Sequence, residues 1–340
     1  MRLLVLGGTA WLGREVAVTA LSQGHEVTCL ARGSSGDAPA GVRCVFADRD
    51  RPDAYDLVAD QRWEAVIDVA RQPGHVRRAV TALEPVADRF LFVSSCNVYA
   101  SQREVGVDEG AALLTPLQSD VMESMEQYGE AKVACEQAVA RAFGASRTLI
   151  ARAGLVGGPG DASGRSGYWP WRFARPSNVQ GAILVPDAAE VPTAVIDVRD
   201  LAAWLVDCAE AGTVGVFNAG GDTFSLADHI TTVRTVAGHT GPVITAPEDW
   251  LLICGVQNWS GPRSLPLWLD DRDWYGMNAR DCASARAAGL IPRPLEQTLA
   301  DTLAWELARP DPGPHGAGLT NDEERDLLDA LASTDDKPID

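Results

Sequence analysis

Residues 2–13 read Arg-Leu-Leu-Val-Leu-Gly-Gly-Thr-Ala-Trp-Leu-Gly, and this stretch decides the fold. The short, continuous apolar run that it begins with predicts a buried β-strand, and the residues after it show a helical pattern that stops at Gly24. A glycine-rich turn between a strand and a helix lets the backbone approach a pyrophosphate, which rests on the helix N-terminus. A turn without a ligand is the alternative. We predict dinucleotide binding by Gly7, Thr9, Ala10, Trp11, Leu12 and Gly13.

Short β-rich runs alternate with helical stretches through the rest of the first half of the chain. The further runs are His25 to Leu30, Arg43 to Phe46, Ala65 to Val69, Phe90 to Val93 and Thr148 to Arg152. Strands separated by helices indicate βαβ units and a parallel sheet that is buried on both faces. The predicted fold class is therefore α/β, a Rossmann-type doubly wound parallel sheet with a smaller C-terminal substrate domain.

A change of composition after Gly154 sets the expected domain limits. Residues 1–164 are expected to form the NAD(P)-binding Rossmann domain, with its sheet completed by about residues 193–222. Residues 165–310 are expected to form mainly the substrate domain. They hold eight of the ten tryptophans, which we expect to form its core rather than to line a pocket. Residues 311–340 are predicted to be a linker and an acidic C-terminal tail, with a short helix at Asp322–Leu331 and a frayed end.

Composition limits the partners and the compartment. The 340 residues include 29 Lys+Arg and 47 Asp+Glu, and the net charge of −18 repels phosphate backbones, so nucleic acid is not an expected partner. Seven cysteines without CxxC spacing and five scattered histidines give no support for a metal site and predict free thiols in a reducing compartment. Neither a signal peptide nor an apolar run of about 20 residues is seen. We expect a cytoplasmic protein that does not contact membranes.

The end of the second predicted strand, Leu30-Ala31-Arg32-Gly33, indicates which cofactor binds. NAD-binding proteins have an acidic residue there for the ribose 2′-hydroxyl, whereas a nearby arginine accommodates the 2′-phosphate of NADP. Ala31 occupies the acid's position and Arg32 follows it, so NADP is preferred over NAD. A solvated loop arginine is the alternative. Asp48, after the third strand, could accept a hydrogen bond from the adenine amine or cap a helix.

Only two of the 29 basic residues are lysines, and one of them, Lys132, lies four residues after Tyr128. That spacing places both side chains on one face of the helix that we expect to begin there. A neighbouring cation favours the phenolate and brings the tyrosine pKa, ordinarily about 10, toward neutrality. A compact ammonium also donates to ribose hydroxyls more readily than a planar guanidinium does. We infer an acid/base tyrosine and a lysine that tunes it, with a solvated helix face as the alternative.

The predicted strand from Phe90 to Val93 runs into Ser94-Ser95-Cys96-Asn97-Val98-Tyr99. Ligands of doubly wound sheets bind beyond the carboxyl ends of the strands. A serine hydroxyl there could hold a substrate oxygen in the same crevice as the glycine turn. The alternative is that the serine caps the next helix.

In this order, the three elements resemble the short-chain dehydrogenase/reductase superfamily, and more narrowly its extended branch, the NAD(P)-dependent epimerase/dehydratase family. The resemblance covers roughly residues 1–310 and also includes Arg152–Gly160 and Val195–Ala202. It implies Ser95 as the catalytic Ser/Thr, Tyr128 as the acid/base and Lys132 as the ribose-binding lysine. It also implies a homodimer formed through the helix of Tyr128 and its neighbour. Ala10 departs from the family's middle glycine, which implies weaker pyrophosphate binding.

The resemblance implies an NAD(P)-dependent oxidoreductase, a reductase or dehydrogenase acting on a hydroxyl or carbonyl of a small-molecule or sugar-nucleotide-like substrate. An NAD-dependent sugar-nucleotide epimerase or dehydratase is the alternative within the family, and Arg32 favours the reductase. A non-catalytic RNA-binding or nicotinamide-sensing protein on the same fold is the alternative of another class. Net charge −18 and the retained serine, tyrosine and lysine argue against RNA binding.

Arginines and aromatic residues gather in one stretch of the expected substrate domain. Either these side chains clamp an anionic substrate or they form ordinary domain packing. The candidates for the clamp are Arg165, Trp169, Arg172 and Arg175.

Overall fold

A computed structural model describes residues 1–335, so the end of the predicted acidic tail, with Lys337, lies outside the described residues. The chain divides into two compact units. The first unit comprises Met1–Leu155, Val198–Gly221 and Arg280–Pro292. The second unit comprises Val156–Asp197, Asp222–Ala279 and the chain from Arg293 onward.

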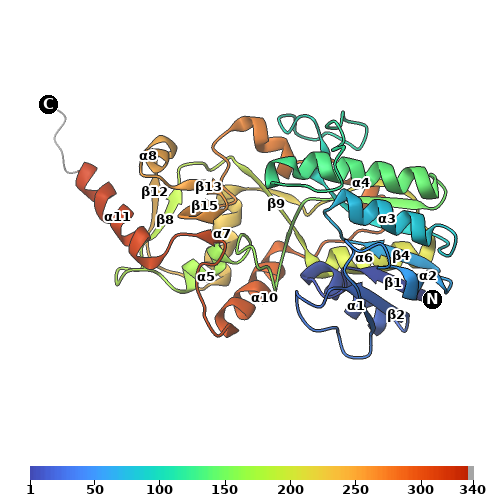
Figure 1. Cartoon of the computed structure of the whole chain (residues 1–340). Coiled ribbons are helices and arrows are strands. Elements are labelled where there is room, and N and C mark those ends of the chain that lie inside the picture. Colours follow the sequence, from blue (N-terminus) through green and yellow to red (C-terminus); the bar gives the residue numbers. More distant parts are fainter. Residues whose placement is uncertain (336–340) are drawn as a thin grey trace. The chain divides into compact units, whose positions relative to one another are not determined.

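The first unit is built on a seven-stranded sheet in which every neighbouring pair is parallel (Figure 1). The strand order is β10-β6-β5-β4-β1-β2-β3. The strands are β1 (Arg2–Leu6), β2 (Glu26–Ala31), β3 (Arg43–Phe46), β4 (Ala65–Asp68), β5 (Phe90–Ser95), β6 (Thr148–Ala153) and β10 (Gly215–Ala219). The order reverses between β1 and β4, which is where doubly wound sheets bind ligands at their carboxyl ends. The predicted Rossmann-type sheet is confirmed.

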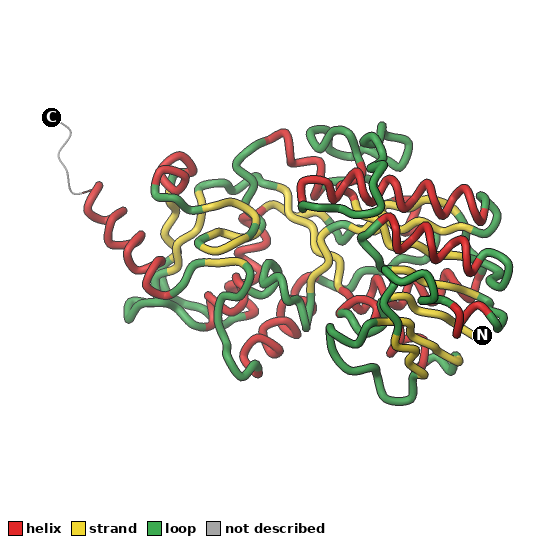
Figure 2. Tube along the Cα trace, viewed as in Figure 1, coloured by secondary structure: helices red, strands yellow, loops and turns green. Residues whose placement is uncertain are grey.

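Helices cover both faces of this sheet (Figures 1 and 2). α3 and α4 lie side by side, and α1 packs with α6. The continuous apolar sequence of β1 is needed because alternate side chains point to opposite faces, and all of Leu3–Leu6 are buried. The helices of the first unit are α1 (Trp11–Ser22), α2 (Asp56–Ala59), α3 (Pro73–Leu83), α4 (Tyr128–Phe143), α6 (Val198–Ala211) and α9 (Ala283–Ala287), with short 3-10 helices η1 (Cys96–Val98) and η2 (Met125–Gln127).

The second unit combines small sheets with helices. Its sheets are β11 (Thr223–Ser225) with β9 (Pro192–Asp197) and β7 (Leu155–Gly157), β12 (Val243–Ala246) with β8 (Ile183–Pro186), β13 (Gln257–Trp259) with β15 (Ser264–Pro266), and β14 (Gly261–Pro262) with β16 (Ala317–Gly318). Its helices are α5 (Tyr168–Ala174), α7 (Leu226–Val236), α8 (Glu248–Ile253), α10 (Leu295–Ala308) and α11 (Asn321–Asp335), with the 3-10 helix η3 (Arg272–Asn278).

The two units divide the chain differently from the expected domain limits. β9 pairs with β11 and β7, so of residues 193–222 only the part from α6 to β10 completes the seven-stranded sheet. Residues 280–292, expected in the substrate domain, belong to the first unit. There the Asn218 side-chain amide donates to the Asp281 carbonyl at 3.0 Å, and the Trp204 indole donates to the Ala288 carbonyl at 3.0 Å. An apolar strand pattern predicts burial but does not specify the sheet that the strand joins.

The expected tail contains a longer helix than predicted. α11 spans Asn321–Asp335, and its Leu327 and Leu331 side chains are buried. Glu324 is fully buried and lies 3.3 Å from Arg172 of α5. This part of the chain therefore belongs to the core of the second unit.

The described residues include the groups on which the expectations about thiols, metal ions and membranes depend. All seven cysteines are free thiols, and burial raises the pKa of Cys29, Cys96 and Cys135 to about 12, which makes these thiols unreactive. Within residues 1–335, no three His, Cys, Asp or Glu side chains are grouped so as to hold a metal ion. In the same range no helix is both long and apolar enough to cross a bilayer.

Candidate active site

The turn between β1 and α1 requires glycine at three positions. Gly7 has φ +93°, a left-handed conformation that side chains disfavour. A Cβ atom on Gly13 would lie 2.3 Å from the carbonyl oxygen of Gly7, and one on Gly8 would lie 2.2 Å from the sulfur of Cys29. The three glycines therefore let α1 begin directly against the carboxyl end of β1.

The N-terminus of α1 fits the phosphates of a dinucleotide. Ala10 is the N-cap and makes no side-chain cap hydrogen bond, and the first turn of α1 has no acidic residue. The helix dipole there favours an anion, and no carboxylate opposes it. Ala10 has φ −85° and ψ 157°, an extended conformation that any residue adopts. The methyl group at this position is therefore accommodated without backbone strain.

A cavity of about 330 Å³ extends from this turn along the carboxyl ends of β2 and β4. Of the turn residues, Gly7, Thr9 and Ala10 line it, whereas Trp11, Leu12 and Gly13 form the first turn of α1. The exposed Arg32, directly after β2, also lines it. Other residues that line the cavity, which no sequence motif indicated, are Ser34, Ser35, Asp50, Ala70, Arg71, Gln72 and His75. Most of them follow predicted strands closely, and this was the available signal, because the carboxyl ends of parallel strands meet at one edge of the sheet.

Asp48 does not line this cavity. Its carboxylate accepts the backbone N–H of Asp50 at 3.1 Å, so it shapes the turn after β3. Asp50 lines the cavity instead and bonds His75 at 2.9 Å and Arg78 at 3.2 Å. The hydrogen bond with His75 is the main cause that lowers the pKa of Asp50.

A buried ion pair supports the wall of the cavity. The Arg49 guanidinium donates to both carboxylate oxygens of Asp68, at 2.8 and 2.6 Å, and to the Tyr55 hydroxyl at 2.7 Å. Burial alone would lower the pKa of Arg49, but the charge and hydrogen bonds of Asp68 outweigh it and raise the pKa. Arg49 is thus fixed within the protein and joins the turn after β3 to the end of β4.

Lys132 is buried and joins the ends of two strands. Its ammonium donates to the carbonyl of Ala70 and to the carbonyl of Val93, both at 2.7 Å. The nitrogen lies 5.8 Å from the ring centroid of Tyr128, so phenol and ammonium share one face of α4. Because Ala70 also lines the cavity, the ammonium lies beside the cavity wall.

Tyr128 is the first residue of α4 and Ser95 is the N-cap of η1, and these two elements contact each other. Tyr128 is half-buried at the first position of α4. A Cβ atom on the next residue, Gly129, would lie 2.2 Å from the Asn97 carbonyl, so α4 begins directly against η1. The Ser95 hydroxyl accepts the Asn97 backbone N–H at 3.2 Å and donates to the Asn97 side chain at 3.1 Å. Ser95 therefore caps η1 in this structure, at the same edge of the sheet.

The residues expected to clamp a substrate lie in the second unit, and two of them are core residues. Arg172 is fully buried, pairs with Glu324 and donates to the Leu319 carbonyl at 2.5 Å. Trp169 is fully buried, and its indole donates to the Pro266 carbonyl at 2.6 Å. The substrate role predicted for these two residues is therefore corrected, because an enclosed and bonded side chain cannot reach a substrate.

The other two expected substrate residues occupy different surroundings. Arg165 is half-buried, and its guanidinium lies 5.4 Å from the Trp259 ring centroid. Arg175 is exposed just after α5 and donates to the neighbouring Ala174 carbonyl. The four residues do not form one group.

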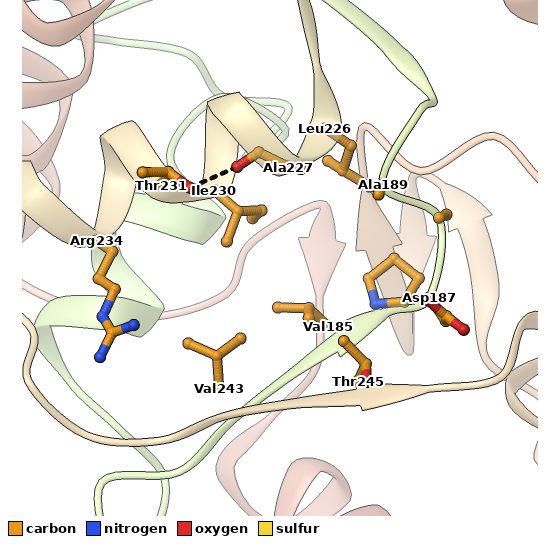
Figure 3. A pocket seen from close by; sticks show the side chains of 12 residues that line it. Val185, Asp187, Ala189, Leu226, Ala227, Ile230, Thr231, Arg234, Val243 and Thr245 are labelled. Atoms are coloured by element: carbon orange, nitrogen blue, oxygen red, sulfur yellow. Dashed lines mark hydrogen bonds between the residues drawn. The ribbon is translucent and has the colours of Figure 1, made fainter.

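The second unit has a cavity of its own, of about 250 Å³, between α7 and the β8–β12 pair (Figure 3). Ile230 of α7 faces Val185 and Val243 of the two strands, with Arg234 and Asp187 at opposite ends. No residue predicted for catalysis or cofactor binding lines it. This cavity is therefore separate from the candidate active site.

The fold and the site define a class. A parallel doubly wound sheet, a glycine turn at its first strand and a buried lysine one helical turn after a tyrosine are typical of dinucleotide-binding oxidoreductase folds. Residues 3–220 match the NAD dependent epimerase/dehydratase family, and the chain belongs to this family.

Two curated relatives have named activities. The chain is 32% identical over 161 residues to 2′-dehydrokanamycin reductase of Streptomyces kanamyceticus, a match that covers 46% of this chain and 43% of that one. It is 28% identical over 179 residues to dTDP-6-deoxy-L-talose 4-dehydrogenase (NAD(P)(+)) of Kitasatospora kifunensis, covering 47% and 54%. The chain thus spans about half the length of the curated relatives it matches.

Solved structures of similar fold cover nearly the whole chain. UDP-glucose 4-epimerase from Bifidobacterium longum, in complex with NAD+ and UDP, matches with a TM-score of 0.64 at 16% identity, covering 91% of this chain and 99% of that one. UDP-N-acetylglucosamine 4-epimerase from Bacillus cereus matches with a TM-score of 0.65 at 15% identity, covering 92% and 98%. At these identities the likeness shows the fold.

Proposed function

We propose that this chain is an NAD(P)-dependent reductase or dehydrogenase that interconverts a carbonyl and a hydroxyl group, with Tyr128 as the acid/base. The observation that carries the proposal is the buried Lys132 ammonium, 5.8 Å from the Tyr128 ring and bonded to the cavity residue Ala70. Its hydrogen-bond partners are two neutral carbonyls rather than a carboxylate. Its positive charge therefore lies beside the Tyr128 ring and is not neutralised by either of these partners.

Each of the three site residues has a defined task in the proposal. When bound, the nicotinamide cofactor supplies or accepts the hydride. Tyr128 gives its phenolic proton to the substrate oxygen as a carbonyl becomes a hydroxyl, and takes it back in the reverse direction. The Ser95 hydroxyl rotates from Asn97 toward that oxygen and holds it. Lys132 has a third N–H donor beyond the two that bind carbonyls, and this donor would hold the ribose of a bound cofactor.

For the substrate we propose a small molecule or a sugar-nucleotide-like compound with a carbonyl or hydroxyl group. The support is membership of the family and the names of the two curated relatives, a reductase and a dehydrogenase.

The second candidate function is an NAD-dependent epimerase or dehydratase, which family membership equally supports. Two incubations separate the candidates: a keto-sugar derivative with reduced cofactor, and the corresponding hydroxy-sugar with oxidised cofactor. A reductase consumes the reduced cofactor in proportion to product, whereas an epimerase isomerises the hydroxy-sugar with no net change in the cofactor. Isomerised product with the cofactor unchanged would reject the reductase.

We further propose that the cofactor is NADP rather than NAD. The exposed Arg32 and the hydroxyl residues Ser34 and Ser35 line the cavity beyond β2, and Ala31 replaces the acid that would bind the 2′-hydroxyl of NAD. Asp50 also lines the cavity, and its carboxylate is engaged by His75 and Arg78. A 2′-phosphate would therefore meet a guanidinium and two hydroxyls.

Ligand-dependent stabilisation tests the cofactor directly, because a ligand raises stability by RT ln(1 + [L]/Kd). We expect larger thermal shifts with NADP and NADPH than with NAD and NADH at equal concentration. Arg32→Ala should reduce the shift with NADPH and leave the shift with NADH unchanged. A larger shift with NAD than with NADP would overturn the preference, and no shift with any of the four would overturn cofactor binding itself.

A cytoplasmic location, a homodimer and the absence of nucleic-acid partners stay predictions. For the dimer we propose the α3–α4 surface, where the half-buried Ala138 and Ala142 lie in a groove that Gln137 and Arg141 also line. Sedimentation of the purified chain would show a dimer of the 36.2 kDa protomer, and a monomer at all concentrations would reject it.

A further inference from the structure

α4 carries a second charged residue, Glu136, on the face that holds Tyr128 and Lys132. Glu136 follows Lys132 by four residues, the spacing that places it one turn further along the same face. It is 4% exposed. One carboxylate oxygen accepts the Ser94 hydroxyl at 2.5 Å and the Arg152 Nε–H at 3.1 Å, and the other accepts a second Arg152 N–H at 2.9 Å. The carboxylate is thus enclosed by protein donors.

Arg152 extends these contacts across the edge of the sheet. From the end of β6 it donates to the Tyr99 hydroxyl at 3.1 Å and to the Glu109 carbonyl at 3.0 Å. The Tyr99 hydroxyl donates in turn to Asn218 of β10. Burial alone would lower the pKa of Arg152, but Glu136 outweighs it and raises the pKa, so the guanidinium stays charged. One network therefore joins α4 to the ends of three neighbouring strands.

The same helix face fixes consecutive residues of β5. Lys132 binds the carbonyl of Val93, and Glu136 binds the side chain of Ser94. The next residue along the strand is Ser95, which the proposed function assigns to the substrate oxygen. A shift of the Ser94 side chain would therefore displace Ser95 relative to α4. The placement of Ser95 matters for catalysis, since a displacement of a catalytic group by about 1 Å can reduce turnover by about 100-fold.

We propose that Glu136, held by Arg152, is a positioning residue that fixes Ser94 to α4 and thereby sets the placement of Ser95 relative to Tyr128 and Lys132. The inference rests on the proposed function for its catalytic consequence. Glu136 does not itself contact the reacting atoms, because its carboxylate is buried and occupied by Ser94 and Arg152.

The first unit offers a matched control in its other buried ion pair. Asp68 and Arg49 are also enclosed, also bonded through two N–H groups, and also at the carboxyl edge of the sheet. They support the cofactor cavity rather than the contact of β5 with α4. Asp68→Asn and Glu136→Gln each remove one buried charge with little change of volume. Both variants leave a buried guanidinium without its carboxylate, so a loss of stability is expected in both.

The experiment measures thermal stability, cofactor Kd, kcat and KM for the wild type, Glu136→Gln and Asp68→Asn. Both variants should melt at lower temperature. Glu136→Gln should reduce kcat by about 10- to 100-fold and leave the cofactor Kd within about twofold. Asp68→Asn should instead mainly weaken cofactor binding. An unchanged kcat in Glu136→Gln would overturn the positioning role. So would equal changes of kcat and equal changes of the cofactor Kd in the two variants.

Two further measurements keep the inference separate from folding defects and from the proposed function. Ser94→Ala removes the hydroxyl that Glu136 accepts and leaves the ion pair intact, so it should lower kcat with little loss of stability. Wild-type kcat in Ser94→Ala would overturn the inference even if Glu136→Gln does not fold.

Hydrogen exchange reports the structural effect without any substrate. Faster exchange of the Ser95 to Val98 amides in Ser94→Ala, but not in Asp68→Asn, supports the inference, and equal exchange overturns it. If the two variants show this exchange pattern but the wild type is inactive toward all substrates, the proposed function alone is rejected.

Discussion

Ala10 and Gly13 lie in one turn and differ in the room that each leaves for a side chain. Ala10 has an extended backbone conformation and is the N-cap of α1, a position at which glycine is more favourable than alanine. We therefore expect Ala10→Gly to change the cofactor Kd by less than about threefold and to raise the stability by up to about 1 kcal/mol. Titration with NADPH and thermal unfolding check this. A tenfold tighter Kd would show that the methyl group obstructs the pyrophosphate.

Gly13→Ala is the reverse exchange in the same turn. The added methyl group would lie 2.3 Å from the Gly7 carbonyl oxygen, a backbone atom that cannot move without displacing the turn. We expect a loss of about 1 to 3 kcal/mol in the free energy of unfolding and a loss of cofactor binding. Chemical denaturation and the same NADPH titration measure both effects. Wild-type values for Gly13→Ala would contradict the geometry described for this turn.

The site residues differed in how well sequence reasoning could place them. Tyr128 and Lys132 were predictable because helical spacing alone fixes their shared face. Arg172 was not, since an arginine among aromatic residues has the same sequence pattern in a substrate pocket and in a core. Only the position of Glu324, 152 residues later in the chain, shows that Arg172 is neutralised inside the second unit. Ser34 and Ser35 follow a predicted strand end, yet serines after a strand are common in any loop.

At the scale of one element, α7 contains a histidine that is neutral in the folded second unit. His229 is 1% exposed, and burial lowers its pKa to about 4. The Thr193 hydroxyl lies 3.4 Å from one ring nitrogen. The folded pKa is below the unfolded value of about 6.5, so protonation favours unfolding. The stability that depends on neutral His229 is complete above pH of about 6.5 and is lost as the pH falls toward about 4.

His229→Gln, which does not titrate, should remove this part of the pH dependence. Between the two pKa values the wild type should lose up to about 1.4 kcal/mol per pH unit more than the variant. Urea unfolding followed by tryptophan fluorescence at several pH values measures the difference. If the free energies of unfolding of wild type and variant change in parallel with pH, protonation of His229 does not destabilise the folded state.

The elements themselves were predictable to different degrees. The strands β1 to β6 follow from apolar runs that must be buried on both faces of a parallel sheet. The end of α1 follows from Gly24, which has φ +82°. β9 shows the limit of such reasoning, because its apolar run is equally suited to the large sheet and to the small sheet with β11 and β7 that it joins. Strand pairing over long sequence separations depends on contacts that no local pattern encodes.

At the scale of the whole chain, distant segments are tied together by buried charges. In the second unit, Glu324 of α11 pairs with Arg172 of α5 and accepts the Leu184 backbone N–H of β8 at 3.2 Å. Glu324→Gln should destabilise the second unit by about 3 to 5 kcal/mol, because it leaves the fully buried Arg172 unpaired. Denaturant unfolding measures this loss.

Asp326→Asn is the matched control, since it makes the same change of charge at an exposed position of the same helix. Its effect should stay within about 0.5 kcal/mol. Equal and small effects of both substitutions would show that α11 does not anchor the second unit. The acidic composition of this segment suggested a solvated tail, and the buried Glu324 could not be distinguished from its acidic neighbours by charge alone.

We propose that Tyr128, beside the Lys132 ammonium, is the acid/base of an NAD(P)-dependent reaction. A comparison of wild type and Tyr128→Phe, with NADPH and a carbonyl substrate that the wild type reduces, tests this role directly. The phenylalanine keeps the ring and removes the proton-transferring hydroxyl. We predict that kcat falls by about 100- to 10,000-fold while the Kd for NADPH is unchanged. Wild-type turnover in Tyr128→Phe would contradict the acid/base role of Tyr128.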